Sequence, residues 1–204
     1  MDQPDCCIIG AGPAGLVLAL LLARKGVSVT VLESQKDLAR DFRGDTVHAS
    51  TLEIMDQLGL ADAVLELPHV KMRRLAINTP SRTIPVVDFE RLPSRFRYIA
   101  LMPQEHFLGF LVREASRYPG FEICYGSGVN GLVEEAGRVT GVSGRRASEP
   151  FSLKAGLVVG ADGRFSRLRK LLALEGTAQS PAMDVAWIRF SRRPGDPEEG
   201  GAFY

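Results

Sequence analysis

The chain has 204 residues, of which 45% are apolar and 24% charged, and its formal net charge is +1. This composition is typical of a globular domain and excludes a disordered or collagen-like chain. The near balance of 25 basic and 24 acidic residues argues against nucleic acid as a partner, because no global basic field is present. The longest apolar stretch is too short to span a bilayer, and Cys6, Cys7 and Cys124 form no disulfide framework. We therefore expect a cytoplasmic protein with no membrane span and reduced cysteines.

The first thirty residues or so show the clearest pattern. A short apolar run over residues 5–9 predicts a strand, and the sequence GAGPAG follows at residues 10–15. An apolar pattern with helical spacing then continues to Lys25, and residues 27–32 are rich in β-branched side chains. This is a β–α–β unit, which predicts a parallel sheet.

The glycine spacing in this unit is typical of a loop that binds a dinucleotide. Gly10 allows a tight turn, Gly12 lets the backbone approach a pyrophosphate, and Gly15 lets the helix pack close to the strand. Glu33 ends the second strand, where a carboxylate accepts hydrogen bonds from ribose hydroxyls and repels a 2′-phosphate. The unit therefore favours FAD or NAD over NADP and leaves the choice between FAD and NAD open. The alternative is a glycine-rich turn without a ligand.

The rest of the chain predicts an α/β fold with additional antiparallel strands. A helix is expected at residues 46–58, a hairpin at 70–88 with its turn at 78–81, a strand at 98–102 and a helix at 103–118. Further strands are expected at 121–125, 129–135, 138–144, 151–153, 155–160 and 185–190, and a helix at 166–174. Residues 129–153 read as a three-stranded antiparallel meander. The tail from Pro194 reads as a loop with no closing element after it.

Three later segments decide between the cofactors. They are RGDTVHASTLEIMDQLGL at 43–60, LMPQ at 101–104 and LVVGADGRFSRLR at 157–169. Together with the glycine loop they resemble, in order and spacing, the class A flavoprotein monooxygenases, the p-hydroxybenzoate hydroxylase-like family. The resemblance implies a Rossmann-like FAD-binding domain, in which a parallel sheet has helices on both faces. It also implies an FAD-binding domain over residues 1–175, a β excursion at about 70–97 that belongs to the substrate side, and the start of a β-rich substrate domain at 176–204.

The resemblance also implies which residues bind FAD. Arg43 would reach the pyrophosphate or the ribityl chain, where a bidentate guanidinium suits a diphosphate, and Gln104 would bind the ribityl chain. Val129 would contact the adenine through its backbone. Asp162 and Gly163 would support the riboses and the approach of NAD(P)H. The residues that would hold the ADP half are Gly10, Gly12, Pro13, Ala14, Gly15, Glu33 and Ser34.

Each of these residues also has a purely structural interpretation. Arg43 could be a surface arginine, Gln104 only the first residue of a helix, and Val129 a core residue. Asp162 could cap the following helix, alone or in addition to a ligand role. His48 reads as a structural helix residue, and the three cysteines read as core. We expect no metal site.

One departure from the family pattern concerns its second FAD motif, a Gly-Asp pair followed by a long helix. No such motif follows Phe190, so the chain resembles the N-terminal part of a longer enzyme. On its own we expect it to bind FAD weakly and to hydroxylate nothing.

The function implied is that of the FAD-binding part of an FAD- and NAD(P)H-dependent monooxygenase acting on an aromatic or polyketide-like small molecule. An FAD-dependent reductase or dehydrogenase of the same fold, and a non-catalytic nucleotide-binding remnant, stay open. So does a homo-oligomer. No catalytic acid, base or nucleophile is predicted, since the cofactor carries the chemistry.

Overall fold

The protein is described by a computed structural model that covers residues 3–39, 44–174, 191, 193–195 and 201–203. The chain divides into two compact units. Unit 1 comprises Met1–Ala39 and Leu108–Ala182, and unit 2 comprises Arg40–Phe107 and Met183–Tyr204. Helix α4 (Gln104–Ala115) begins in unit 2 and continues into unit 1. The predicted domain boundaries at residue 175 stay a prediction.

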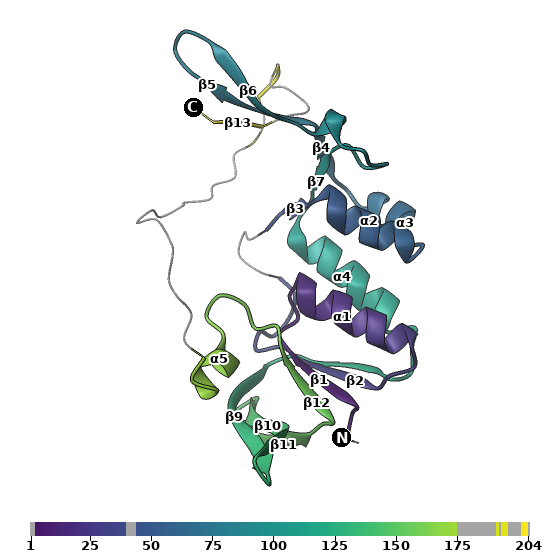
Figure 1. The fold of residues 1–204 in the computed structure, drawn as a ribbon, viewed down its shortest axis with the longest axis vertical. Coiled ribbons are helices and arrows are strands. Elements are labelled where there is room, and N and C mark those ends of the chain that lie inside the picture. Colours follow the sequence, from purple (N-terminus) through teal and green to yellow (C-terminus); the bar gives the residue numbers. More distant parts are fainter. Residues whose placement is uncertain (1–2, 40–43, 175–190, 192, 196–200, 204) are drawn as a thin grey trace. The chain divides into compact units, whose positions relative to one another are not determined.

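Unit 1 is built on a parallel sheet with the strand order β12-β1-β2-β8, of which β12, β1 and β2 are labelled in Figure 1. The strands are β1 (Cys6–Ile9), β2 (Val29–Leu32), β8 (Phe121–Cys124) and β12 (Leu157–Gly160). All neighbours pair in parallel, and α1 (Pro13–Arg24) connects β1 to β2. Every residue of β1 and β2 is buried, as in sheets covered on both faces. The predicted Rossmann-like parallel sheet is confirmed.

Different elements pack on the two faces of this sheet. Helix α1 packs on one face (Figure 1). On the other face Cys7, Ile9, Leu32 and Cys124 join a core with the meander of β9 (Ser127–Glu135), β10 (Arg138–Arg146) and β11 (Glu149–Lys154). Leu168 of helix α5 (Arg167–Leu171) completes this core. A helix thus lies on each face, but the second face is covered mainly by the predicted antiparallel meander.

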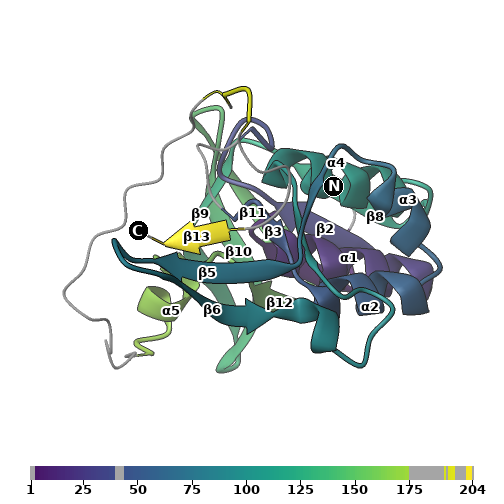
Figure 2. The same cartoon turned by 90° about the horizontal axis from the view of Figure 1, so that it is seen from above.

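The described residues of unit 2 form two small sheets. In the first, β7 (Ile99–Leu101) lies between β3 (Thr46–Val47) and β4 (Val70–Met72), and both pairings are antiparallel. The second has the order β13-β5-β6 (Figure 2), with β5 (Arg74–Asn78), β6 (Thr83–Asp88) and β13 (Gly201–Phe203). Helices α2 (Ala49–Gln57) and α3 (Ala61–Leu65) pack on each other, and the 3-10 turn η1 (Phe89–Arg91) follows β6.

Two details of the sequence prediction for unit 2 are wrong. The helix expected at 46–58 begins only at Ala49, because Thr46 and Val47 pair with β7 as a short strand. β-Branched side chains at both positions suit that strand. The tail is not a loop throughout, because Gly201–Phe203 forms a strand that pairs in parallel with β5. The strand predicted at 185–190 lies outside the described residues.

Candidate nucleotide-binding site

The glycine loop joins β1 to α1, as predicted from its spacing. Gly10 has φ +104°, and a Cβ there would lie 2.5 Å from the carbonyl oxygen of Ala161. A Cβ at Gly15 would lie 2.1 Å from the carbonyl oxygen of Gly10 and 3.3 Å from the Cβ of Ala161. The backbone nitrogen of Ala161 donates a hydrogen bond of 2.8 Å to Ile9. The loop and the segment after β12 are therefore packed backbone against backbone, which leaves room only for glycine at positions 10 and 15.

Gly12 has a different environment. It is the N-cap of α1 with φ −76° and ψ 177°, and nothing lies within 4 Å of the position that a Cβ would take. The helix start has no side-chain cap and no acidic residue in its first turn, and Pro13 and Ala14 are exposed. The first N–H groups of a helix lack partners within the helix and lie at its positive end. This end of α1 therefore offers an open surface that suits a phosphate group.

Glu33, directly after β2, accepts a hydrogen bond from the glycine loop. Its side chain is 4% exposed, and Oε2 accepts a hydrogen bond of 2.8 Å from the backbone nitrogen of Ala11. Oε1 accepts from the backbone nitrogen of Gln35 at 2.9 Å and from Ser34 Oγ at 3.2 Å. The carboxylate thus lies against the loop, where a ribose would have to approach. The sequence indicated the ribose role of Glu33 but not this structural one.

Asp162 supports the start of helix α5, whose N-cap residue is Ser166. Its Oδ2 accepts hydrogen bonds from the backbone nitrogens of Arg167 and Leu168, at 2.6 and 3.1 Å. Its Oδ1 accepts from Ser166 Oγ at 2.5 Å, and that hydroxyl accepts from the backbone nitrogen of Arg169 at 3.1 Å. The capping interpretation of Asp162 is therefore confirmed. Because a Cβ on Gly10 would lie 3.0 Å from the Asp162 Cα, this turn also lies directly beside the glycine loop.

The capping role predicts the effect of removing the carboxylate. We expect Asp162→Ala to lower the free energy of unfolding by about 1–2 kcal/mol, because several N–H and O–H donors lose their acceptor. Asp162→Asn keeps one acceptor oxygen and should lose about half as much. Urea unfolding of the two variants without cofactor measures the difference, and equal stability of Asp162→Ala and the parent would exclude the cap as a stabilising element.

The other two predicted residues of unit 1 occupy contrasting positions. The side chain of Val129 is 9% exposed and belongs to the core between sheet and meander, so the core interpretation is confirmed for the side chain. Its backbone lies opposite Gly144 in the ladder of β9 and β10. Gly163 is exposed with φ +76°, in the turn that leads to α5.

In unit 2, Gln104 is the first residue of α4 and lies beside the loop before β3. Its backbone nitrogen donates to Asp45 Oδ1 at 3.3 Å, and the backbone nitrogen of Met102 donates to the Asp45 carbonyl oxygen at 2.9 Å. A Cβ on Gly44 would lie 2.6 Å from the side-chain nitrogen of Gln104. Arg43 lies outside the described residues, although a single peptide bond joins it to Gly44.

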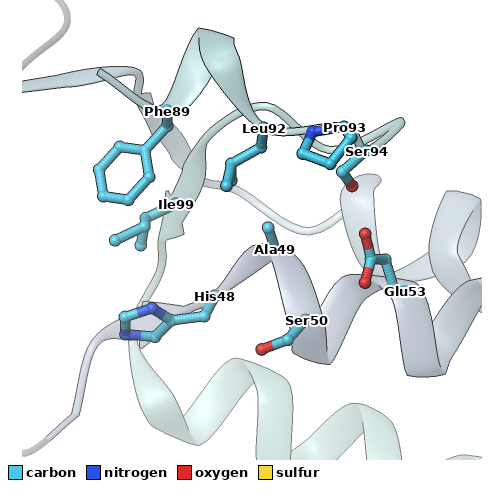
Figure 3. Close-up of a pocket in the computed structure, with 9 residues that line it drawn as sticks. All are labelled: His48, Ala49, Ser50, Glu53, Phe89, Leu92, Pro93, Ser94 and Ile99. Atoms are coloured by element: carbon cyan, nitrogen blue, oxygen red, sulfur yellow. The ribbon is translucent and has the colours of Figure 1, made fainter. Parts of the chain in front are cut away.

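Unit 2 also contains a pocket of about 280 Å³ between the start of α2 and the η1 segment (Figure 3). Ile99, Leu92 and Phe89 form apolar walls, while the side chains of Glu53 and Ser94 point toward one another at one side of the pocket (Figure 3). The lining residues are His48, Ala49, Ser50, Glu53, Phe89, Leu92, Pro93, Ser94 and Ile99. His48, expected to be a structural helix residue, is the N-cap of α2 but makes no side-chain cap hydrogen bond. Among the residues that the structure describes, none that was predicted to bind FAD lines this pocket.

The cysteines lie in the core of unit 1. All three are buried and form no disulfide, and burial raises the pKa of the Cys7 thiol to about 12. Such a thiol stays protonated and unreactive at neutral pH. Within the part of the chain that the structure describes, no cluster of His, Cys, Asp and Glu could hold a metal ion. Over the same residues, no helix is long and apolar enough to cross a membrane.

Comparison with known proteins decides the family. Residues 3–203 match the model of the family described as "FAD binding domain". The chain belongs to this family. The predicted resemblance to class A FAD-dependent monooxygenases, and the choice of FAD as cofactor, are thereby confirmed.

Its relatives include enzymes of more than one type. The chain is 36% identical over 188 residues to a 6-methylpretetramide 4-monooxygenase of Streptomyces rimosus, covering 92% of this chain and 45% of that protein. It is 29% identical to a digeranylgeranylglycerophospholipid reductase of Methanococcoides burtonii, covering 85% and 41%. The solved structure of an anhydrotetracycline hydroxylase from S. rimosus superimposes with a TM-score of 0.73 at 33% identity, covering 88% and 35%. The chain thus spans less than half the length of these relatives.

Proposed function

We propose that this chain is the FAD-binding part of an FAD- and NAD(P)H-dependent monooxygenase that hydroxylates an aromatic or polyketide-like small molecule. The observation that carries the proposal is the open N-terminal end of α1 at Gly12, beside the buried Glu33 carboxylate, which accepts a hydrogen bond from Ala11 of the glycine loop. Family membership supplies the cofactor, and the 6-methylpretetramide and anhydrotetracycline relatives supply the substrate class.

The residues of the glycine loop would bind the ADP half of FAD. The backbone at Gly12, Ala14 and Gly15 would donate to the pyrophosphate, and Pro13, which has no N–H, fixes the first turn of the helix. Glu33 would accept hydrogen bonds from the ribose hydroxyls. Ser34 donates to Glu33, which orients that carboxylate.

The remaining assignments follow the family resemblance. Arg43 and Gln104 would contact the pyrophosphate or ribityl part, Val129 the adenine through its backbone, and Asp162 and Gly163 the riboses. When bound, FAD would supply the redox centre for electrons from NAD(P)H and for O₂. We also place the protein in the cytoplasm, since its three buried cysteines form no disulfide. Self-association into a homo-oligomer stays open.

The cofactor assignment can be tested by titrating the purified chain with FAD and with FMN, following flavin fluorescence. We expect saturable binding of FAD and at least ten-fold weaker binding of FMN, because FMN lacks the adenylate that the glycine loop and Glu33 would hold. Equal affinity for the two flavins would overturn the assignment of this loop.

A second candidate is an FAD-dependent reductase of the same fold, favoured by the similarity to the M. burtonii reductase. The two functions differ in their use of oxygen. With NAD(P)H and a phenolic or polycyclic substrate, the monooxygenase consumes O₂ and forms a hydroxylated product. A reductase instead saturates a double bond under anaerobic conditions.

Arg43 offers a test that depends on the resemblance alone. We expect Arg43→Ala to weaken FAD binding by about 1.5–3 kcal/mol if the guanidinium makes a charged hydrogen bond to the cofactor. The free energy of unfolding without cofactor should change little, since a loop arginine is rarely part of a core. Equal FAD affinity of the variant and the parent would favour a surface arginine.

A further inference from the structure

We propose that Gly44 and Asp45 are positioning residues for Gln104: Asp45 fixes its backbone, and Gly44 leaves the space from which its side-chain amide reaches the flavin cofactor. The inference rests on the proposed function, in which Gln104 binds the ribityl chain. It goes beyond that function because neither Gly44 nor Asp45 is itself assigned a contact with FAD.

Asp45 fixes the backbone from which the Gln104 side chain extends. Its Oδ1 accepts a hydrogen bond from the Gln104 nitrogen at 3.3 Å, and its carbonyl oxygen accepts one from Met102 at 2.9 Å. Next to it, Thr46 pairs with Leu101 in the ladder of β3 and β7. The start of α4 is therefore attached to this loop on both sides of Pro103.

Gly44 leaves free the space in which the Gln104 amide lies. The side-chain nitrogen of Gln104 would lie 2.6 Å from a Cβ at position 44, closer than a Cβ can approach. The amide therefore occupies the space that any other residue at position 44 would need. Gly44 also has φ +71°, but this alone does not explain the contact: Gly59 has the same φ and nothing within 4 Å of its Cβ position.

This arrangement matters because a glutamine side chain has several rotatable bonds, and its amide can both donate and accept hydrogen bonds. A side chain whose backbone is fixed and whose space is kept free loses less entropy when it binds a ligand. A methyl group at position 44 would displace the amide, so the effect on FAD should pass through Gln104.

The experiment is a double-mutant cycle on FAD affinity with Gly44→Ala, Gln104→Ala and both together. We expect each single variant to weaken FAD binding five- to twenty-fold, and the double variant to be no weaker than Gln104→Ala. Gly59→Ala is the matched control, because it has the same backbone strain without the collision. It should leave FAD affinity unchanged.

The outcomes distinguish FAD binding by Gln104 from the positioning role of Gly44. Unchanged affinity in Gln104→Ala would show that Gln104 does not bind FAD, and with it the inference falls. Weaker binding in Gln104→Ala but unchanged binding in Gly44→Ala, or multiplied losses in the double variant, would overturn the positioning role alone.

If Gly44→Ala does not fold, Asp45 supplies the same test. Asp45→Ala should weaken FAD binding in the parent but cause no further loss in the Gln104→Ala background. Asp45→Asn keeps an acceptor oxygen and should restore most of the affinity. An equal loss from Asp45→Ala in both backgrounds would overturn the inference.

Discussion

Replacing Glu33 with arginine is expected to lower the free energy of unfolding by about 3–5 kcal/mol, even without a cofactor. The side chain is 4% exposed and accepts hydrogen bonds from the backbone nitrogens of Ala11 and Gln35. Arginine cannot accept from either N–H group and would place an unpaired cation in the same space. Urea unfolding monitored by circular dichroism measures the loss, which is a large part of the stability of an ordinary domain.

The control for this prediction is Glu33→Gln, which keeps the shape and one acceptor oxygen. We expect it to lose about 1–2 kcal/mol, since one backbone N–H would then face an amide NH₂. FAD binding should weaken in Glu33→Arg as well. It is measured without urea, at a temperature where the variant is folded. Stability of Glu33→Arg equal to that of the parent would contradict the hydrogen bonds that tie β2 to the glycine loop.

The sequence predicted most of unit 1, because its signals are local. The apolar runs of β1 and β2 and the glycine loop between them each lie within a few residues of the element they define. The roles of Glu33 and Asp162 were only partly predictable. Each depends on backbone donors that the fold brings to the carboxylate, and a sequence does not show which donors those are.

Unit 2 was harder to predict because its short strands depend on partners far along the chain. Thr46 and Val47 continue the pattern of the helix that follows, and only pairing with Ala100 and Leu101 makes them a strand. Gly201 begins β13 although glycine is rare in strands, since its partner Leu75 lies in β5. The contact between Gly44 and Gln104 likewise appears only once β3 and β7 are paired.

The second large effect is expected at Gly15. A Cβ there would lie 2.1 Å from the carbonyl oxygen of Gly10, which is backbone and cannot swing away. Gly15→Ala must therefore push α1 away from the loop. We expect a loss of about 2–4 kcal/mol in the free energy of unfolding, at the upper end for overpacked sites.

Gly12→Ala is the matched variant in the same motif, with the opposite expected result. Its Cβ position is open and its φ of −76° suits any residue, so unfolding should become easier by less than about 1 kcal/mol, the cost of alanine at an N-cap. FAD affinity, however, should fall at least ten-fold, because the new methyl group would occupy the surface where the pyrophosphate approaches the backbone.

Urea unfolding and FAD titration of both variants give the comparison. Parent-like stability of Gly15→Ala would show that α1 can shift without cost. Parent-like FAD affinity of Gly12→Ala would place the phosphate elsewhere than at the open end of α1.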